Sequence, residues 1–443
     1  MATVLTEWNA HCDEVPSAPR PKVLFFAYYF PPLNSIACVR TWNIAKYLSR
    51  LGWEVTVITP DPRLWRKRND SSQVDSDLHR VRVQRILTGH RWRCLSPGHL
   101  KCWDGTVGWL LGGVCRKIAR HLGIEMTIGW EREAKAACAA LSPKDVDVIL
   151  ASGPPFVSFR LAKYLSARLG RPYVLDYRDP WVDICGSNVR NQRVTRNEQS
   201  EIIKASSAVT VVSPSVLKWR FNLGSNEHVI SNGFDPEELR DVTPHDFGHF
   251  AIVYAGVFYP PMRVITPVMA ALKRLAETYL SGSKETREWK FHYFGPEGDH
   301  VLHEARAFGI TDKVCIHGRV SRGKALSAVR GAGVCVVIAS VFEEMADPDR
   351  YIVPGKLFEA LGLGTPVLFI GPSGSDADAV TEATGLVRKL PAKDVEGLAT
   401  FFQEVMSGKI PVVKRLDTYA WPNLIRGFDN VLRQVIRRNT GSR

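Results

Sequence analysis

Short apolar runs alternate with segments of helical periodicity along this chain, and this alternation constrains its fold more than any other feature. The first series opens with an apolar run at 22–27, a helical pattern at 39–51 that Gly52 ends, and a second run at 54–59. A strand–helix–strand order implies parallel strands joined by a right-handed crossover. The series continues with expected strands at 146–151, 172–176, 209–212 and 228–230, and a helix at 157–169.

A second series begins near Phe250, beyond the turn signal Asn232-Gly233. Its expected strands are 251–255, 289–294, 314–317, 334–338 and 366–370, and its expected helices are 265–279, 301–308, 323–330 and 355–361. The 443 residues suit two domains of about 200 residues each. We therefore expect an α/β protein with two Rossmann-like, doubly wound domains that face each other across a ligand cleft.

The domain boundaries follow from these patterns. We expect a flexible tail at 1–20, a first domain at 21–235, a second domain at 236–415 and a closing helix within 416–443. The alternation fails between 86 and 133, which we interpret as an inserted helical or loop region. We also expect the amphipathic last helix, 421–438, to cross back to the first domain.

Composition limits the classes of protein that fit. The chain has no apolar run of about 18 residues, which predicts no transmembrane helix, and residues 1–20 lack the apolar core of a signal peptide. Nine cysteines without a C-x-x-C pair favour reduced thiols in a cytoplasmic protein over disulfides or a zinc site. The net charge of +13 fits a nucleotide diphosphate, an acidic membrane face or nucleic acid, and equally a basic surface with no partner.

The most informative stretch begins with Pro354-Gly355-Lys356, a turn at the start of a predicted helix. The free N–H groups and the positive dipole end of such a helix form an anion site. Glu359 follows one turn into the helix, where its carboxylate could accept hydrogen bonds from two hydroxyls, as a ribose requires. Alternatively, Glu359 only complements the helix dipole.

The stretch 354–367 resembles the donor-site signature of retaining GT-B glycosyltransferases of the family 4 type. Shorter strings in the family's order extend the resemblance over nearly the whole chain: 28–32 with Arg40, 45–48, 52–57, 152–155, 176–181, 211–213, 230–235, 254–256 and 294–296. The resemblance implies the GT-B fold, with the donor nucleotide on the second domain and the acceptor on the first.

The resemblance also assigns the nucleotide half of the donor site. Glu359 would hold the ribose, behind the turn formed by Pro354, Gly355 and Lys356. Gly256 would bring its backbone close to the diphosphate, which a side chain would obstruct. The remaining candidates are basic residues for the diphosphate (Arg263, Arg319 and, as an alternative, Lys324) and a loop that meets the nucleobase (His317 and Val320).

The sugar half departs from the family pattern. Many members carry a glutamate eight positions before the ribose glutamate, whereas this chain has Tyr351 there, so we expect Tyr351 at the sugar. Glu343 and Glu344 could approach the sugar instead, or form an exposed acidic pair.

On the acceptor side, Asp176, Arg178 and Asp179 follow a strand of the first domain and are expected to face the cleft. Arg178 could hold a phosphate or a sugar hydroxyl, and Asp179 could orient it or receive the acceptor proton. The alternative is a structural Asp–Arg network. The first loop, with Asn34, Ser35 and Arg40, is also assigned to the acceptor side, although this loop lacks the glycine that the family has there.

The resemblance implies a metal-independent glycosyltransferase, a hexosyltransferase that retains the donor configuration and needs no cofactor beyond its nucleotide-sugar donor. Asp376-Ala377-Asp378 has the letters of a metal motif but lies in a Gly/Ser-rich loop, so we assign no metal ligand.

The acceptor would be lipid-linked or a small molecule, and no nucleic acid is expected. Basic residues and tryptophans within 91–121 could contact the inner membrane face or merely form a solvated surface. A GT-B nucleotide-sugar epimerase and a non-catalytic membrane- or nucleic-acid-binding protein are the alternative functions.

Overall fold

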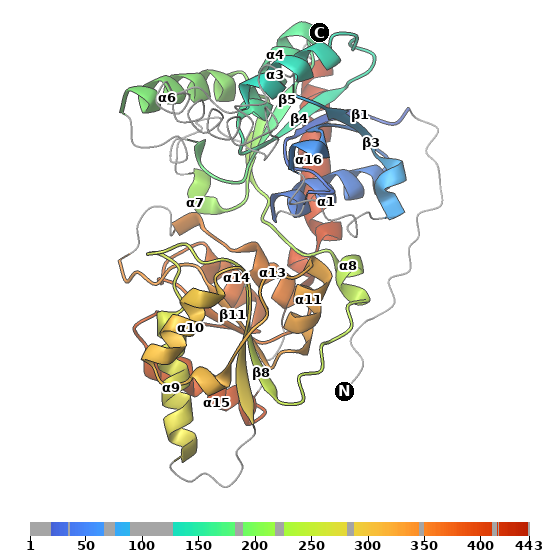
Figure 1. Ribbon diagram of the computed structural model, residues 1–443. Coiled ribbons are helices and arrows are strands. Elements are labelled where there is room, and N and C mark those ends of the chain that lie inside the picture. Colours follow the sequence, from blue (N-terminus) through green and yellow to red (C-terminus); the bar gives the residue numbers. More distant parts are fainter. Residues whose placement is uncertain are drawn as a thin grey trace, which may run out of the picture.

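Two parallel sheets, each covered by helices, form the framework of the molecule (Figure 1). The structure is a computed structural model that describes residues 19–33, 36–65, 76–88, 127–181, 189–217, 226–280, 288–344, 350–409, 414 and 416–441. Asn34, Ser35 and the 91–121 segment lie outside the described residues, as does most of the predicted tail.

The first sheet has seven strands in the order β3-β2-β1-β4-β5-β6-β7. Every pair in it is parallel, and β1 lies between β2 and β4, where Val23 pairs with Val55 of β2 and with Val148 of β4. The strands are β1 (Lys22–Ala27), β2 (Glu54–Pro60), β3 (Arg82–Ile86), β4 (Val148–Gly153), β5 (Tyr173–Tyr177), β6 (Ala208–Val211) and β7 (Glu227–Val229). The helices of this half are α1 (Ile36–Arg50), α3 (Ile128–Ala137), α4 (Val157–Leu169), α6 (Val189–Lys204), α7 (Pro214–Leu217) and α8 (Pro236–Arg240).

The second sheet has six strands in the order β10-β9-β8-β11-β12-β13, again all parallel. Its strands are β8 (Phe250–Ala255), β9 (Trp289–Phe294), β10 (Val314–Ile316), β11 (Val334–Ile338), β12 (Val367–Ile370) and β13 (Val387–Leu390). Its helices are α9 (Thr266–Leu280), α10 (Gly298–Ala307), α11 (Arg322–Gly331), α13 (Gly355–Gly362), α14 (Ala377–Thr384) and α15 (Val395–Met406). Short 3-10 helices lie at Pro62–Trp65, Ser76–Arg80, Thr311–Lys313 and Leu416–Tyr419.

Each sheet has a core on both faces, because successive side chains of a strand point to opposite sides. In β1, Leu24 and Phe26 belong to one buried cluster, while Val23 and Phe25 belong to another. Such strands are buried on both sides and read as continuous apolar runs rather than as alternating ones. This burial explains why most of these strands could be predicted from their apolar runs.

The last helix, α16 (Trp421–Gly441), returns to the first domain, as the sequence predicts. Ile425, Phe428 and Leu432 pack in the same buried cluster as Val23 and Phe25 of β1. Figure 1 shows α16 rising from the second domain to lie against the first, near α1. Within the described residues, no helix has both the length and the apolar character to cross a bilayer.

Candidate functional site

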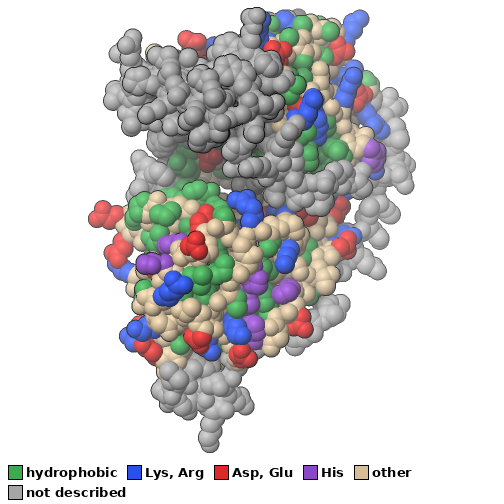
Figure 2. Space-filling view, viewed as in Figure 1, with side chains coloured by type: hydrophobic (Ala, Val, Ile, Leu, Met, Phe, Trp, Pro, Cys, Tyr) green, Lys and Arg blue, Asp and Glu red, His purple; other side chains and the backbone are tan. Residues whose placement is uncertain are grey.

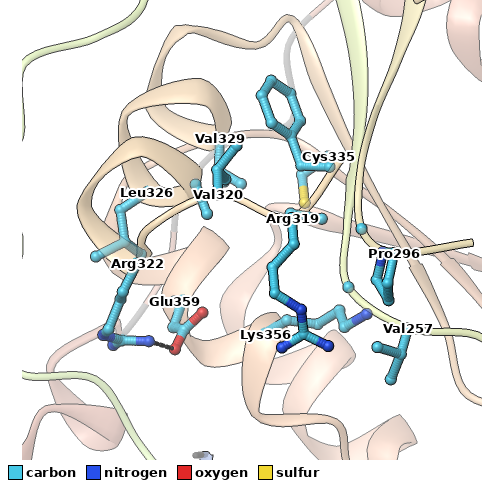
Figure 3. A pocket seen from close by; sticks show the side chains of 15 residues that line it. Val257, Pro296, Arg319, Val320, Arg322, Leu326, Val329, Cys335, Lys356 and Glu359 are labelled. Atoms are coloured by element: carbon cyan, nitrogen blue, oxygen red, sulfur yellow. Dashed lines mark hydrogen bonds and ion pairs between the residues drawn. The ribbon is translucent and has the colours of Figure 1, made fainter. Parts of the chain in front are cut away.

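A pocket of about 220 Å³ lies in the second domain, between the ends of β8 and β9 and the N-terminal turns of α11 and α13 (Figure 3). Pockets that enclose a whole small-molecule ligand measure roughly 300–1,000 Å³, so this one suits one part of a longer ligand. It combines an apolar wall with charged side chains. Its lining is Ala255, Gly256, Val257, Phe294, Gly295, Pro296, Arg319, Val320, Arg322, Ala325, Leu326, Val329, Cys335, Lys356 and Glu359.

Lys356 enters the pocket from the first turn of α13, directly after the N-cap Pro354 and Gly355. Its Nζ lies 4.3 Å from the ring centroid of Tyr254, a cation–π contact. Burial lowers the pKa of Lys356 to about 8, because an ammonium out of water is disfavoured. An anion beside it would restore the charged form.

Gly256 makes room for this ammonium. Its φ is +149°, a backbone conformation that favours glycine, and a Cβ added there would lie 2.2 Å from Nζ of Lys356. The sequence assigned Gly256 to close backbone approach by a diphosphate. The structure shows that Lys356 already occupies the space that a side chain at this position would need.

Glu359 lies in α13 on the same side of the pocket as Lys356, where Arg322 reaches it. Nη1 of Arg322 donates to Oε1 of Glu359 at 2.5 Å. Nε and Nη2 of Arg322 donate to the two carboxylate oxygens of Glu238 in α8, at 2.7 and 3.0 Å. Burial alone would lower the pKa of Arg322, but the carboxylates of Glu359 and Glu238 raise it, so the guanidinium stays charged.

Arg319 and Val320 also line the pocket, in the loop between β10 and α11. Figure 3 shows the Arg319 side chain extending toward Lys356. The lining thus carries three cationic side chains, Arg319, Arg322 and Lys356, against the single carboxylate of Glu359. Together with the free N–H groups at the start of α13, this balance favours an anionic group.

His317 lies beside the pocket rather than in its lining. Its ring stacks on Phe294, which does line the pocket, with centroids 4.1 Å apart. Its Nε2 is 2.9 Å from Nδ1 of His292, and Nε2 of His292 is 2.9 Å from Nε2 of His249. We call these three residues the histidine chain; Figure 2 shows histidine side chains gathered on this face of the second domain.

Arg178 and Asp179 of the first domain and Arg263 of the second are predicted residues that lie close enough for their charges to interact. Arg178 lies over the ring of Tyr29 at 5.6 Å, and its backbone N–H donates to the carbonyl of Gly153 at 2.9 Å. Burial raises the pKa of Asp179, while the charges of Arg178 and of Arg263 from the second domain oppose the rise. Arg263 does not line the pocket, and its Nε donates to the carbonyl of Ala339 at 2.9 Å.

Asp176 and Arg40 form a buried network away from the pocket. Arg40 donates twice to the Asp176 carboxylate, at 3.0 and 2.7 Å, and Arg40 and Asp176 are 2% and 0% exposed. Ser152 and Thr210 add hydrogen bonds of 2.8 Å each to the same carboxylate. Burial alone would raise the pKa of Asp176, but Arg40 and these hydrogen bonds lower it. This geometry fits the structural Asp–Arg network that the sequence offered as the alternative to catalysis, with Arg40 as the arginine.

Tyr351 and most of the acidic candidates bind other parts of the protein. Tyr351 packs in the core cluster of the first domain, and its carbonyl accepts a hydrogen bond of 3.0 Å from Oγ of Ser213. Glu343 pairs with Lys393 at 2.8 Å, and Glu344 is exposed. Asp376 accepts hydrogen bonds from Ser215, while Asp378 pairs with Lys389. In the described part of the chain, no group of three His, Cys, Asp or Glu side chains is placed to hold a metal ion.

Sequence reasoning missed Arg322 and Glu238. One signal was present, because Arg322 and Lys324 lie in the first turn of a helix, where the dipole disfavours cations. A basic residue placed against the dipole indicates a partner elsewhere in the fold. Glu238, 84 residues earlier, could not be identified as that partner from sequence spacing.

Residues 37–233 match the model of the glycosyl transferase 4-like domain. Among solved structures, the chain is similar to sucrose-phosphate synthase from Thermosynechococcus elongatus (15% identity, 96% of this chain and 98% of that chain covered, TM-score 0.56). It is also similar to the N-terminal domain of Candida albicans trehalose-6-phosphate phosphatase (12% identity, 95% and 98% covered, TM-score 0.60). A third is the Anabaena protein HepE in complex with UDP and glucose (14% identity, 96% and 99% covered, TM-score 0.53).

A comparison with curated proteins finds none that matches the sequence. At these identities the structural likenesses establish the fold: two Rossmann-like domains in the GT-B arrangement, as the sequence predicted.

Proposed function

We propose that this protein is a glycosyltransferase whose pocket binds the nucleoside half of a nucleotide diphosphate-sugar. The observation that carries the proposal is the joint placement of Glu359, Lys356 and Arg319 around one pocket at the start of α13. The glycosyl transferase 4-like domain at 37–233 supports the same reaction class. Further support comes from HepE, a fold neighbour that was solved with UDP-glucose.

In the proposed donor complex, Glu359 accepts hydrogen bonds from ribose hydroxyls. Lys356, Arg319 and the N-terminal turn of α13 hold the diphosphate. These groups stabilise the negative charge that develops on the diphosphate as its bond to the sugar breaks, so we propose that no metal ion is required. A bound diphosphate also keeps Lys356 protonated, which offsets the effect of burial on its pKa.

The acceptor side of the proposed reaction lies between the domains. The acceptor hydroxyl forms a bond to the sugar on the face that the diphosphate leaves, which retains the configuration, as in the retaining GT-B enzymes that the sequence resembles. Asp179 is the candidate to receive the hydroxyl proton, because burial raises its pKa and favours proton uptake. Arg178 beside it can hold a sugar hydroxyl or a phosphate. We further propose that the protein acts at the cytoplasmic side on a lipid-linked or small-molecule acceptor.

An assay of donor consumption tests this proposal. The protein is incubated with UDP-, ADP- and GDP-sugars, with and without an acceptor extract, and released nucleoside diphosphate is measured. We expect release from at least one donor that increases when the extract is present. Conversion of the sugar to its epimer without release would instead indicate an epimerase. No consumption of any donor, combined with salt-sensitive binding to RNA or anionic liposomes, would indicate a non-catalytic binding protein.

A further inference from the structure

Arg322 occupies an unusual position for an arginine, between two carboxylates that come from different parts of the chain. Glu238 belongs to α8, in the connection between the two sheets, and Glu359 belongs to the pocket. The Arg322 side chain is 14% exposed, against 36% for Glu238 and 18% for Glu359. A bidentate arginine–carboxylate pair restricts both partners geometrically, beyond the attraction of their charges.

The hydrogen bonds divide the Arg322 guanidinium between two tasks. Nε and Nη2 face Glu238 and fix the plane of the guanidinium. Nη1 then meets only Oε1 of Glu359. In the described part of the chain, no donor meets the second oxygen, Oε2, so the carboxylate is held by one oxygen while the other remains available to a ligand.

The anchoring residue Glu238 is itself fixed to the first domain through its neighbour. Glu237 accepts hydrogen bonds from Arg50 of α1 at 2.5 and 2.7 Å and lies 3.1 Å from Nζ of Lys46. The N-cap of α8, Asp235, pairs with Lys46 at 2.8 Å. The short helix α8 is therefore held on one side by α1 and on the other by Arg322.

We infer that Arg322, anchored by Glu238, is a positioning residue that orients the Glu359 carboxylate for the two ribose hydroxyls of the donor. The inference rests on the proposed function and deepens it, because it assigns the preference for ribonucleotides to an arginine of the pocket lining that acts through Glu359. Glu359 without Arg322 could turn among its rotamers, and each orientation would have to be restricted again when the ligand binds. Arg322 acts through Glu359, so it is not a catalytic residue.

Ribose selectivity provides the test. Dissociation constants are measured by calorimetry for UDP, ADP and GDP and for the 2′,3′-dideoxy form of whichever binds the wild-type protein most tightly. We expect the wild type to prefer the ribonucleotide by tenfold or more. In Arg322→Met the preference should fall to threefold or less, while affinity for the dideoxy form stays within threefold of wild type. Arg322→Lys should retain part of the preference.

Two further variants complete the experiment. Glu238→Gln keeps the shape of the anchor and removes its charge on a partly exposed side chain, so it should fold and show an intermediate preference. Arg306→Met, which removes an exposed arginine from α10, serves as the control and should match the wild type.

The outcomes separate this inference from the proposed function. The positioning role would be overturned if Arg322→Met lost affinity for the ribonucleotide and the dideoxy form equally. It would also be overturned if the ribonucleotide preference were unchanged in a folded Arg322→Met and in Glu238→Gln. Either result would leave the proposed function standing. If the wild-type protein bound none of the three nucleoside diphosphates, both would fall together.

Discussion

Gly256 and Lys356 show how one residue of the site depends on the absence of a side chain at another. The ammonium of Lys356 is placed over the face of Tyr254, in space that any side chain at position 256 would fill. Lys356 is also the residue that we propose to contact the diphosphate. We therefore propose that Gly256 contributes to ligand binding by leaving room for the lysine as well as through its own backbone.

Gly256→Ala should weaken donor binding although it changes no charge. The new Cβ would overlap Nζ of Lys356, and the strained backbone conformation adds to the cost. Loss of a hydrogen bond from a charged group costs about 1.5–3 kcal/mol, so we expect roughly a 10- to 100-fold higher dissociation constant for the donor by calorimetry. Gly323→Ala is the matched control, because a Cβ there meets nothing within 4 Å. Wild-type affinity in a folded Gly256→Ala would show that the ammonium is not needed where the structure places it.

At the scale of elements, burial decides how well the sequence predicts the structure. The strands 22–27, 289–294 and 334–338 have the predicted limits, because strands buried on both faces consist mainly of apolar residues. The edge strands β3 and β13 escaped prediction, since Arg82 and Arg85, or Arg388 and Lys389, interrupt their apolar pattern. The helix α6 escaped for a similar reason, as its sequence is mostly hydrophilic.

The residues of the candidate site also differ in how well they could be placed from the sequence. Lys356, Glu359 and Gly256 could be placed from sequence because a turn, a helix start and a strand end are local patterns, and the structure brings all three to one pocket. Asp176 has the same carboxylate as a catalytic aspartate, and only the fold reveals that Arg40 donates two hydrogen bonds to it. The position of Tyr351, inside the core of the first domain, likewise depends on how the two domains meet.

The histidine chain, which includes His292 of the second sheet, should make the stability of the folded protein depend on pH. His292 of β9 is 4% exposed, and burial lowers its pKa from 6.5 to about 4, with the nearby His317, His249, His245 and Lys290 adding to the effect. The unfolded chain therefore binds a proton between pH 6.5 and 4 that the folded chain does not. The contribution of His292 to stability is complete above pH 6.5 and is lost as the pH falls toward 4.

We expect this loss to be on the order of 2 kcal/mol. Urea unfolding of wild type and His292→Gln at pH 7.5 and pH 4.5 measures it. The variant should lose less stability between the two pH values, while a change of the exposed His303 to Gln should follow the wild type. Parallel pH profiles of stability for His292→Gln and wild type would contradict a contribution of His292 to this pH dependence.

At the scale of the whole molecule, the two domains are connected on opposite sides. On one side lie α8 and α16, where the backbone N–H of Trp421 donates to the carbonyl of Phe234 at 3.0 Å. On the other side, in Figure 1, α7 of the first domain approaches the second domain. There the backbone N–H and Oγ of Ser215 each donate to the Asp376 carboxylate at 2.7 Å.

The Ser215–Asp376 contact should hold the two domains in the arrangement that the structure shows. Hydrogen bonds to a charged group are worth about 1.5–3 kcal/mol each at most, enough to favour this arrangement over one in which the domains separate at this contact. We expect Asp376→Ala to increase the radius of gyration measured by small-angle X-ray scattering, and Asp312→Ala, an exposed aspartate, to leave it unchanged. Identical scattering from Asp376→Ala and wild type would mean that this contact does not hold the domains together.

The central claim is that the pocket at the start of α13 binds a nucleotide diphosphate-sugar through Glu359. The most direct test is calorimetric titration of wild type, Glu359→Ala and the control Glu382→Ala with the donor that the wild type consumes; Glu382 is exposed on α14. We predict that Glu359→Ala weakens donor binding by about 1.5–3 kcal/mol, the scale of a lost charged hydrogen bond, and that Glu382→Ala binds like wild type. Unchanged donor affinity in a folded Glu359→Ala would contradict the claim.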